Sequence, residues 1–264
     1  MSDVSSAASR SRRHPGTKPR RAARLASVLA VTVVGLATPA AAAPHAPGPL
    51  TSGATVAGMD VSGHQGTVNW NSAWRRGARF SYVKATEGTG FRSPTFSSQY
   101  EGALRVGMLR GAYHFGRPDL SGAAEQARFF VANGGGWSPD GHTLPGALDI
   151  EYNPYGPDDC YGLSPAAMSG WIAEFSDTYR ALTGRFPAVY TTRHWWNTCT
   201  AANPDFAGNN PLWVARYGPR VGELPAGWGS HAIWQHDNRG TFPGDQNLFN
   251  GDMAALKRFA TAAP

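Results

Sequence analysis

Apolar positions along the chain fall into two kinds of pattern that alternate from residue 55 onward. Three longer stretches show helical spacing, with apolar residues three and four positions apart, at residues 96–106, 122–133 and 164–183. Shorter runs rich in β-branched and aromatic residues lie around them. These runs predict strands at residues 55–62, 80–86, 109–115, 144–151, 188–192, 212–217 and 232–236.

Strands that alternate with helices pair in parallel and build a barrel or a doubly wound sheet. No helical spacing separates the last three predicted strands, so we expect only loops between them. The pattern therefore predicts an α/β fold, an irregular TIM-like barrel whose last third lacks the regular alternation. Residues 55–264 show no low-complexity break, and we expect them to form one domain.

The first 43 residues have a different composition. They hold seven of the 24 Lys and Arg residues and one of the 18 acids, and so account for the whole formal charge of +6. An apolar run at 25–37 and a run of alanines follow, which is typical of a secretory signal peptide cut after Ala42 or Ala43. A basic tail that binds nucleic acid and an uncleaved anchor are the alternatives, although the run is short for a bilayer. Residues 44–54, rich in Pro and Gly, indicate a flexible lead-in.

The rest of the chain is electrically neutral, with equal numbers of basic and acidic residues. Its charge therefore suggests neither nucleic acid nor membrane as a partner, and we expect a secreted, extracellular monomer. The only two cysteines, Cys160 and Cys199, predict one disulfide in an oxidising compartment, with two free thiols as the alternative. Neither cysteine has a His or Cys at ligand spacing, so no metal site is predicted.

The most informative stretch is residues 144–152, an apolar run that ends in Asp149 and Glu151. In a strand these two carboxyl groups share a face, while Leu148 and Ile150 point into the core. Two carboxylates held this close raise each other's pKa, so one can stay protonated near neutral pH and act as an acid. Cleavage of a glycosidic bond requires such an acid. Acids that cap a loop or pair with Arg are the alternative.

Active groups of α/β barrels gather at the carboxyl ends of the strands. Six polar residues fall at predicted strand ends, namely Asp60, Lys84, His114, Asp149, Glu151 and Gln235. Four aromatic residues near strand ends have flat faces that can stack on sugar rings, namely Tyr113, Tyr190, Tyr217 and Trp234. Ordinary packing is the alternative for each aromatic residue and for His114. Lys84 and Glu87 could instead pair with each other or with Asp60.

Several segments, in this order, resemble the motifs of the family 25 glycoside hydrolases, the N-acetylmuramidase-type lysozymes. They are Gly58-Met59-Asp60-Val61-Ser62, Val83-Lys84-Ala85-Thr86-Glu87-Gly88, Gly111-Ala112-Tyr113-His114-Phe115, Leu148-Asp149-Ile150-Glu151, Leu212-Trp213-Val214-Ala215-Arg216-Tyr217, Ile233-Trp234-Gln235 and Asp245-Gln246-Asn247-Leu248-Phe249. The resemblance spans residues 56–257. The chain departs from the family pattern at Gln246 and at residues 236–238.

The resemblance implies a flattened barrel of five β/α units and three further strands, (β/α)5(β)3. It also implies hydrolysis of the β-1,4 bond between N-acetylmuramic acid and N-acetylglucosamine in bacterial peptidoglycan, without metal or cofactor. By position, Glu151 matches the family's general acid and Asp149 its partner carboxylate. Asp60 and Asp245 match two further acids of the family's site.

Two mechanisms are open once Glu151 protonates the leaving oxygen. In retention the substrate acetamido oxygen attacks the anomeric carbon with help from Asp149, and in inversion an aspartate activates water, with carboxyls about 6.5–9.5 Å apart. We favour retention. A chitinase-like hydrolase and a catalytically silent glycan binder are the alternative functions. The residues expected to contact substrate are Tyr113, His114, Lys84, Glu87, Tyr190, Tyr217, Trp234 and Gln235.

Overall fold

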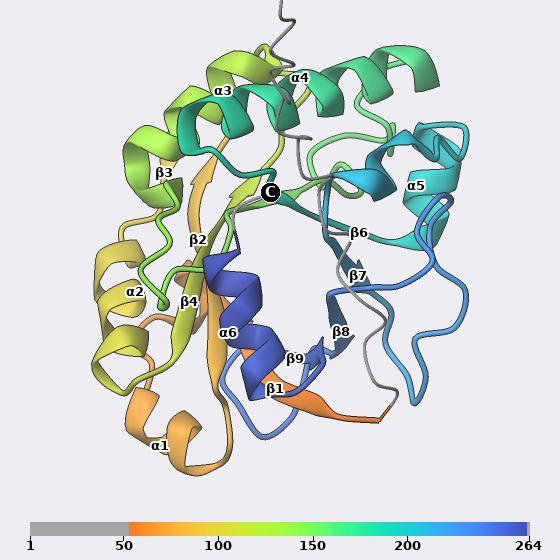
Figure 1. The fold of residues 1–264 in the computed structure, drawn as a ribbon. Helices are drawn as coiled ribbons and strands as arrows, with labels where there is room; N and C mark the ends of the chain where they lie inside the picture. Colours follow the sequence, from red (N-terminus) through yellow and green to blue (C-terminus); the bar gives the residue numbers. More distant parts are fainter. Residues whose placement is uncertain (1–52, 263–264) are drawn as a thin grey trace, which may run out of the picture. The chain divides into compact units, whose positions relative to one another are not determined.

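The computed structural model describes residues 53–262, and Figure 1 shows these residues as a barrel with helices on its outside. The predicted signal segment, residues 1–43, and all but the last two residues of the lead-in lie outside the described residues. Eight strands form the barrel: β1 (Thr55–Val61), β2 (Phe80–Glu87), β4 (Leu109–Phe115), β5 (Ala147–Asp149), β6 (Ala188–Thr191), β7 (Leu212–Ala215), β8 (Ile233–Asp237) and β9 (Asp245–Asn250).

The barrel closes because β1 pairs with β2 on one side and with β9 on the other. Neighbouring strands from β1 to β8 are parallel, and β9 is antiparallel to both β8 and β1. A two-residue strand, β3 (Phe91–Arg92), pairs with the end of β2 outside the ring. Parallel pairing brings the carboxyl ends of seven strands to one end of the barrel.

Five helices follow the first five barrel strands, and a sixth follows β9. They are α1 (Trp70–Arg75), α2 (Phe96–Arg105), α3 (Ala123–Phe130), α4 (Pro165–Thr183), α5 (Arg193–Cys199) and α6 (Met253–Thr261). Short helical turns are η1 (Gly63–Gln65), η2 (Val131–Gly135) and η3 (Asp205–Gly208). Five β/α units therefore precede β7, β8 and β9, which confirms the irregular α/β barrel.

Helix α4 begins and ends where the sequence predicted. The Ser164 hydroxyl accepts a hydrogen bond from the backbone N–H of Ala167, and Pro165 occupies the first turn. Gly184 ends the helix with a left-handed φ of 78°, a conformation that glycine adopts without a Cβ clash. The helix packs on α3, and its buried face covers the outer side of the barrel.

Helix α5 corrects the expectation that only loops join the last strands. It lies between β6 and β7, and its first turn is capped by the Thr192 hydroxyl, which accepts from the N–H of Trp195. Trp195, Trp196 and Cys199 are fully buried. Seven residues are too few to show a helical period, and tertiary burial of two tryptophans decides the conformation instead.

Helix α6 closes the amino end of the barrel, as seen near the centre of Figure 1. Its buried residues Leu256 and Ala260 share one core cluster with Val56, Phe80 and Leu109, which lie at or near the starts of β1, β2 and β4. Apolar packing therefore fills that end, and only the carboxyl end of the barrel is available for a site.

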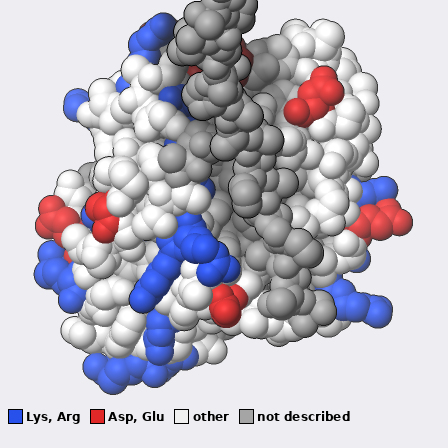
Figure 2. All heavy atoms as spheres, viewed as in Figure 1, with Lys and Arg blue, Asp and Glu red and all other residues white. Residues whose placement is uncertain are grey.

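Figure 2 shows Lys and Arg interspersed with Asp and Glu on the face it draws. The described residues carry equal numbers of basic and acidic side chains. Among the helices of residues 53–262, none combines the length and the apolar character needed to cross a membrane.

Candidate active site

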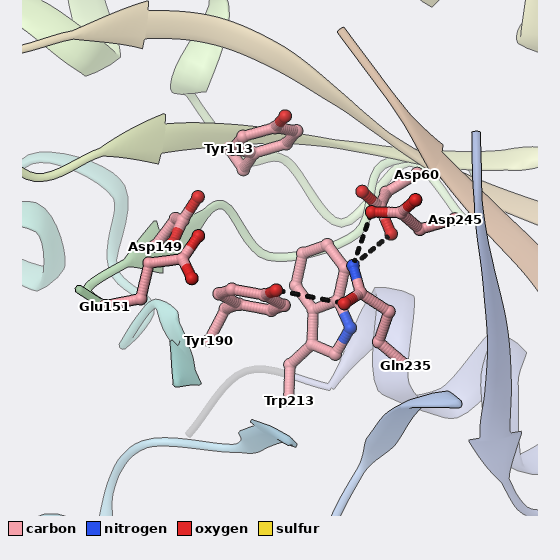
Figure 3. Close-up of a pocket in the computed structure, with 8 residues that line it drawn as sticks. All are labelled: Asp60, Tyr113, Asp149, Glu151, Tyr190, Trp213, Gln235 and Asp245. Atoms are coloured by element: carbon pink, nitrogen blue, oxygen red, sulfur yellow. Dashed lines mark hydrogen bonds between the residues drawn. The ribbon is translucent and has the colours of Figure 1, made fainter. Parts of the chain in front are cut away.

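A pocket opens at the carboxyl ends of the barrel strands (Figure 3). Seven of its eight lining residues were candidates from the sequence, and Trp213 was not. The lining residues are Asp60, Tyr113, Asp149, Glu151, Tyr190, Trp213, Gln235 and Asp245. Figure 3 shows Asp149 and Glu151 on one side, Asp60 and Asp245 on the other, and aromatic rings between them.

The first carboxyl pair is positioned by β5. The strand ends at Asp149, two residues earlier than expected, but the N–H of Ile150 still donates to the carbonyl of Tyr190 at 3.0 Å. Leu148 and Ile150 are fully buried on the outer side, against the helices. Alternation along this extended backbone therefore turns both Asp149 and Glu151 toward the pocket, as predicted.

The second carboxyl pair, Asp60 and Asp245, is held by side-chain amides. The Gln235 Nε2 donates to Asp60 Oδ2 at 2.9 Å and to Asp245 Oδ2 at 3.1 Å. The Asn247 Nδ2 donates to the same Asp60 oxygen at 2.7 Å. The Gln235 Oε1 accepts from the hydroxyl of Tyr190 at 3.0 Å, which leaves the amide nitrogen facing the acids.

Two residues of this network were missed from the sequence, Trp213 and Asn247. The indole N–H of Trp213 donates to Asn247 Oδ1 at 2.8 Å and so fixes the orientation of that amide. Asn247 could have been found because it lies two residues after Asp245 in β9 and therefore shares its face. Trp213 stands in an apolar run and carries no sequence signal that separates it from the core.

Burial makes the carboxyl groups of the site weaker acids than exposed carboxyl groups, because it raises their pKa values. Desolvation raises the pKa of Asp60 to about 7, with a further upward effect from the charge of Asp245. It raises the pKa of Glu151 to about 7, against the opposing charge of Lys84. The pKa of Asp149 lies well above its ordinary value, because of burial and then the charge of Glu151. Near neutral pH the Asp149–Glu151 pair therefore retains a proton.

Lys84 and Glu87 pair with each other, which is one of the alternatives that the sequence left open. The Lys84 Nζ lies 2.7 Å from Glu87 Oε2, and Arg117 Nη1 lies 3.4 Å from the other Glu87 oxygen. The ammonium group also stands 4.8 Å from the ring centroid of Phe115. These residues lie at the end of β2 and β4, outside the set that lines the pocket.

The structure does not bring His114 to the pocket, which corrects the expected substrate contact. The imidazole is fully buried on the outer face of β4, 2.8 Å from Thr86 Oγ1 and 2.9 Å from Gln126 Oε1. Its ring stacks on Phe175 of α4. Burial lowers the pKa of His114 to about 4, so the ring is neutral. Adjacent strand residues face opposite sides, and Tyr113 takes the inner one.

Trp234 lies on the outer face of β8 for the same reason, next to the inward Gln235. Its indole N–H donates to the carbonyl of Arg216 at 2.7 Å. Tyr217 is half-exposed, and its hydroxyl donates to Gln235 Oε1 at 3.2 Å, which puts it at the edge of the second carboxyl pair. Of the expected contact residues, Tyr113, Tyr190 and Gln235 line the pocket itself.

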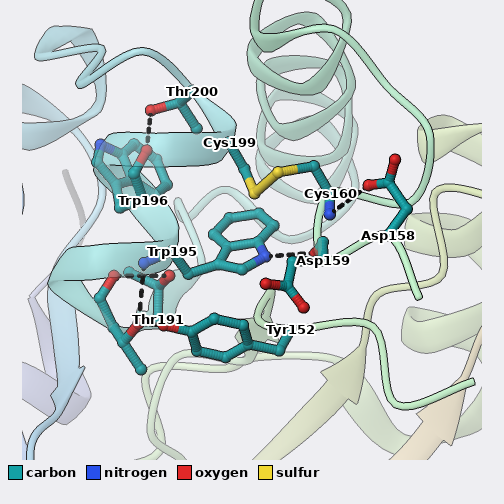
Figure 4. The surroundings of a disulfide bond; sticks show 10 residues. Tyr152, Asp158, Asp159, Cys160, Thr191, Trp195, Trp196, Cys199 and Thr200 are labelled. Carbon is teal, nitrogen blue, oxygen red and sulfur yellow. Dashed lines mark hydrogen bonds between the residues drawn. A yellow bond between two sulfur atoms is a disulfide. The ribbon is translucent and has the colours of Figure 1, made fainter. Parts of the chain in front are cut away.

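The predicted disulfide between Cys160 and Cys199 is present (Figure 4). It joins the segment that follows β5 to the end of α5, with 5.3 Å between the two Cα atoms. Beside it, the indole N–H of Trp195 donates to the carbonyl of Asp159 at 2.8 Å. The segment that follows Glu151 is thus attached to the next β/α unit.

A closed α/β barrel with paired carboxyl groups in a pocket at the strand ends is the arrangement expected of a glycoside hydrolase. Comparison with known proteins identifies the family. The family model described as Glycosyl hydrolases family 25 matches residues 59–245. The chain belongs to glycoside hydrolase family 25.

Proteins named as muramidases or lysozymes, and solved structures of such proteins, are similar to this chain. It is 49% identical over 201 residues to an N,O-diacetylmuramidase of Arthroderma benhamiae, covering 76% of this chain and 85% of the relative. It is 46% identical over 206 residues to Lysozyme M1 of Streptomyces globisporus, covering 76% and 70%. The structure of a muramidase from Acremonium alcalophilum superposes with a TM-score of 0.77 at 52% identity, covering 78% of this chain and 99% of that one.

Proposed function

We propose that this glycoside hydrolase is a secreted muramidase, which cuts the β-1,4 bond between N-acetylmuramic acid and N-acetylglucosamine in bacterial peptidoglycan. The observation that carries the proposal is the pair Asp149 and Glu151, which lines a pocket opposite Asp60 and Asp245. The names of relatives at 46–49% identity, N,O-diacetylmuramidase and Lysozyme M1, support the substrate class. We expect the enzyme to act as a monomer.

In the proposed reaction Glu151 is the general acid. Its pKa of about 7 keeps a large fraction protonated at neutral pH, so that it can protonate the leaving glycosidic oxygen. The ionised Glu151 that remains then accepts a proton from the water that completes hydrolysis. Asp60 and Asp245, fixed by Gln235, complete the carboxyl groups around the sugar.

Asp149 suits the role of orienting the substrate's acetamido group. Its Oδ1 is buried and has no hydrogen-bond partner among the described residues. An acetamido N–H of the substrate would satisfy this oxygen, and such a bond favours the ionised form of Asp149. The proton shared by the pair would then reside on Glu151. The acetamido oxygen attacks the anomeric carbon as the glycosidic bond breaks, and water later replaces it with retention of configuration.

The proposal that the protein is exported rests on its first 43 residues and on the disulfide. A basic block, an apolar run and alanines resemble a secretory signal. A disulfide between Cys160 and Cys199 is typical of proteins that fold in oxidising compartments. We therefore infer an extracellular enzyme that meets cell-wall glycan outside the cell.

The test is digestion of purified peptidoglycan by the parent protein and by Glu151→Gln. New reducing ends are reduced with borohydride and identified by mass analysis. We expect muramic acid ends from the parent and a fall in kcat of roughly 10²- to 10⁴-fold in the variant, the range that a lost general acid gives. Glu174→Gln, an exposed glutamate of α4, is the matched control and should leave the rate unchanged.

Other products would indicate a different function. Glucosamine ends would indicate a glucosaminidase, cleavage of chitin oligomers alone a chitinase-like enzyme, and bound but uncut glycan a silent binder. A separate measurement distinguishes the two mechanisms. NMR of a fresh digest identifies the anomer that is formed first. The β-anomer supports retention, and the α-anomer supports inversion.

A further inference from the structure

Exposed apolar side chains gather beside the first carboxyl pair, on segments that follow β2, β4 and β5. Phe91 is 44% exposed, and Leu120 and Tyr155 are each 61% exposed. None of the three lines the pocket itself. We call these three residues the rim platform.

The three segments of the rim platform are joined by contacts. The Lys84 Nζ, which bonds Glu87, lies 5.6 Å from the ring centroid of Phe91. At Gly88, with a φ of 51°, an added Cβ would stand 3.7 Å from Leu120 and 3.5 Å from the side chain of Arg117. The platform therefore rests on a common base at the ends of β2 and β4.

The ring of Tyr155 packs on the guanidinium group of Arg117. The Arg117 guanidinium carbon lies 4.0 Å from the Tyr155 ring centroid, and the nearby Glu87 raises the pKa of the Tyr155 hydroxyl. Arg117 in turn pairs with Asp119 at 2.7 Å and with Glu87 at 3.4 Å, and only 10% of its side chain is exposed. One face of the ring is thus covered by a buried cation, while most of the side chain remains open to solvent.

The base of the rim platform is electrically balanced. Its two cations, Lys84 and Arg117, are matched by two carboxylates, Glu87 and Asp119, that bond them directly. An open aromatic face over a neutral base offers a flat apolar surface without a net charge. Such a surface suits the C–H face of an uncharged pyranose ring.

Tyr155 is tied to the first carboxyl pair by the chain and by charged contacts. It follows Glu151 by four residues, so their Cα atoms are at most about 14 Å apart. Arg117, which lies over the ring of Tyr155, pairs with Glu87, and Glu87 also pairs with Lys84, whose charge acts on both Asp149 and Glu151. The rim platform is therefore continuous with the Asp149–Glu151 side of the pocket.

We propose that Tyr155 forms a sugar-binding subsite outside the pocket, at which its open ring face stacks on a pyranose of the glycan chain whose cleaved bond lies at Glu151. Phe91 and Leu120 border this subsite. The inference rests on the proposed function, since it takes the ligand to be a peptidoglycan glycan. It makes Tyr155 a specificity residue that favours longer chains.

The test compares kcat/KM on tetra-, hexa- and octasaccharides of alternating N-acetylglucosamine and N-acetylmuramic acid. We expect the parent to prefer the longer chains, and Tyr155→Ala to lose roughly three- to tenfold on these while keeping its rate on the tetrasaccharide. Tyr155→Phe keeps the ring and loses only the hydroxyl, and should retain the preference for length. Leu182→Ala, an exposed leucine of α4, is the control for removal of apolar surface.

A second measurement separates this inference from the proposed function. Affinity for the octasaccharide is measured without turnover, in the Glu151→Gln background, with and without Tyr155→Ala. A loss of affinity of similar size supports the subsite, whatever bond the parent cuts. An equal loss of kcat/KM on all chain lengths, or unchanged affinity in the binding assay, would overturn it. A parent that cuts no glycan would overturn the proposed function alone.

Discussion

At the scale of single residues, the four carboxyl groups of the pocket differ from exposed carboxyl groups in their raised pKa values. Burial raises the pKa of all four, and Lys84 is the cation that opposes this at Asp149 and Glu151. A group that donates a proton must be protonated, so activity should fall as the pH rises through the pKa of Glu151. Lys84 therefore helps to set the pH at which the activity falls.

We predict that Lys84→Met moves the pH–kcat profile to higher pH. Removing the cation takes away the interaction that favours the ionised carboxylates, so their pKa values rise, and we expect a shift of about one pH unit. The measurement is kcat on soluble glycan from pH 4 to 9. Lys257→Met, an exposed lysine of α6, is the control. A profile that stays in place would mean that Glu87 already neutralises Lys84.

The same burial makes stability depend on pH. A carboxyl whose folded pKa is about 7, against an unfolded value near 4, binds more protons in the folded state between these two values. The contribution of Asp60 to stability is therefore complete below about pH 4 and is lost as the pH rises toward 7.

We predict that Asp60→Asn is more stable than the parent at pH 7.5 and not at pH 4. The asparagine carbonyl can still accept from Gln235 and Asn247 but cannot ionise. We expect a gain on the order of 1–3 kcal/mol in the free energy of unfolding at pH 7.5. Urea unfolding at both pH values measures it, with the exposed Asp177→Asn as control. An equal change in the free energy of unfolding at both pH values would contradict the link between the raised pKa of Asp60 and stability.

At the scale of elements, the segment between β5 and α4 carries the chemistry and is held from both sides. Tyr155 binds it to the base of the rim platform, and Cys160 binds it to α5. Only the attachment through Cys160 is covalent, and neither attachment involves a residue that lines the pocket.

We predict that loss of the disulfide lowers the free energy of unfolding by on the order of 3–4 kcal/mol, the chain-entropy value for a loop of this length. The two cysteines are separated by 39 positions in the sequence. The urea midpoint should fall when dithiothreitol is added to the parent. The double variant Cys160→Ser and Cys199→Ser should start at the lower midpoint and not respond, and a response from it would point to another cause.

At the scale of the whole molecule, α6 fills the amino end of the barrel and leaves the carboxyl end to the site. The order of elements makes this arrangement possible, since β9 runs back antiparallel and delivers α6 to the opposite end from the pocket. The described residues need no part of the N-terminal segment to complete the barrel.

We predict that the protein released into the culture medium starts at Ala43 or Pro44. The signal-like segment should be removed on export because its alanines match a signal-peptidase site. Intact mass analysis of the secreted protein checks this. Val33→Arg, which puts a charge into the apolar run, should keep the chain inside the cell. Secretion of that variant at the parent level would contradict the signal.

The sequence by itself determined the kind of fold and the first carboxyl pair. Strand and helix periods are local, so residues 109–115 and 165–183 could be predicted almost to the residue. Asp149 and Glu151 could be paired because an i, i+2 spacing puts two side chains on one face wherever the strand lies.

The tertiary structure alone decided which face of each strand is the inner one and which distant residues meet there. Tyr113 and His114 are neighbours in β4, and only the register of the closed barrel turns Tyr113 inward and leaves His114 under the helices. The contact of Asn247 with Asp60 joins the first and last strands of the barrel, β1 and β9. Periodicity along the sequence carries no information about such closure, because it depends on pairing between strands that are far apart in the chain.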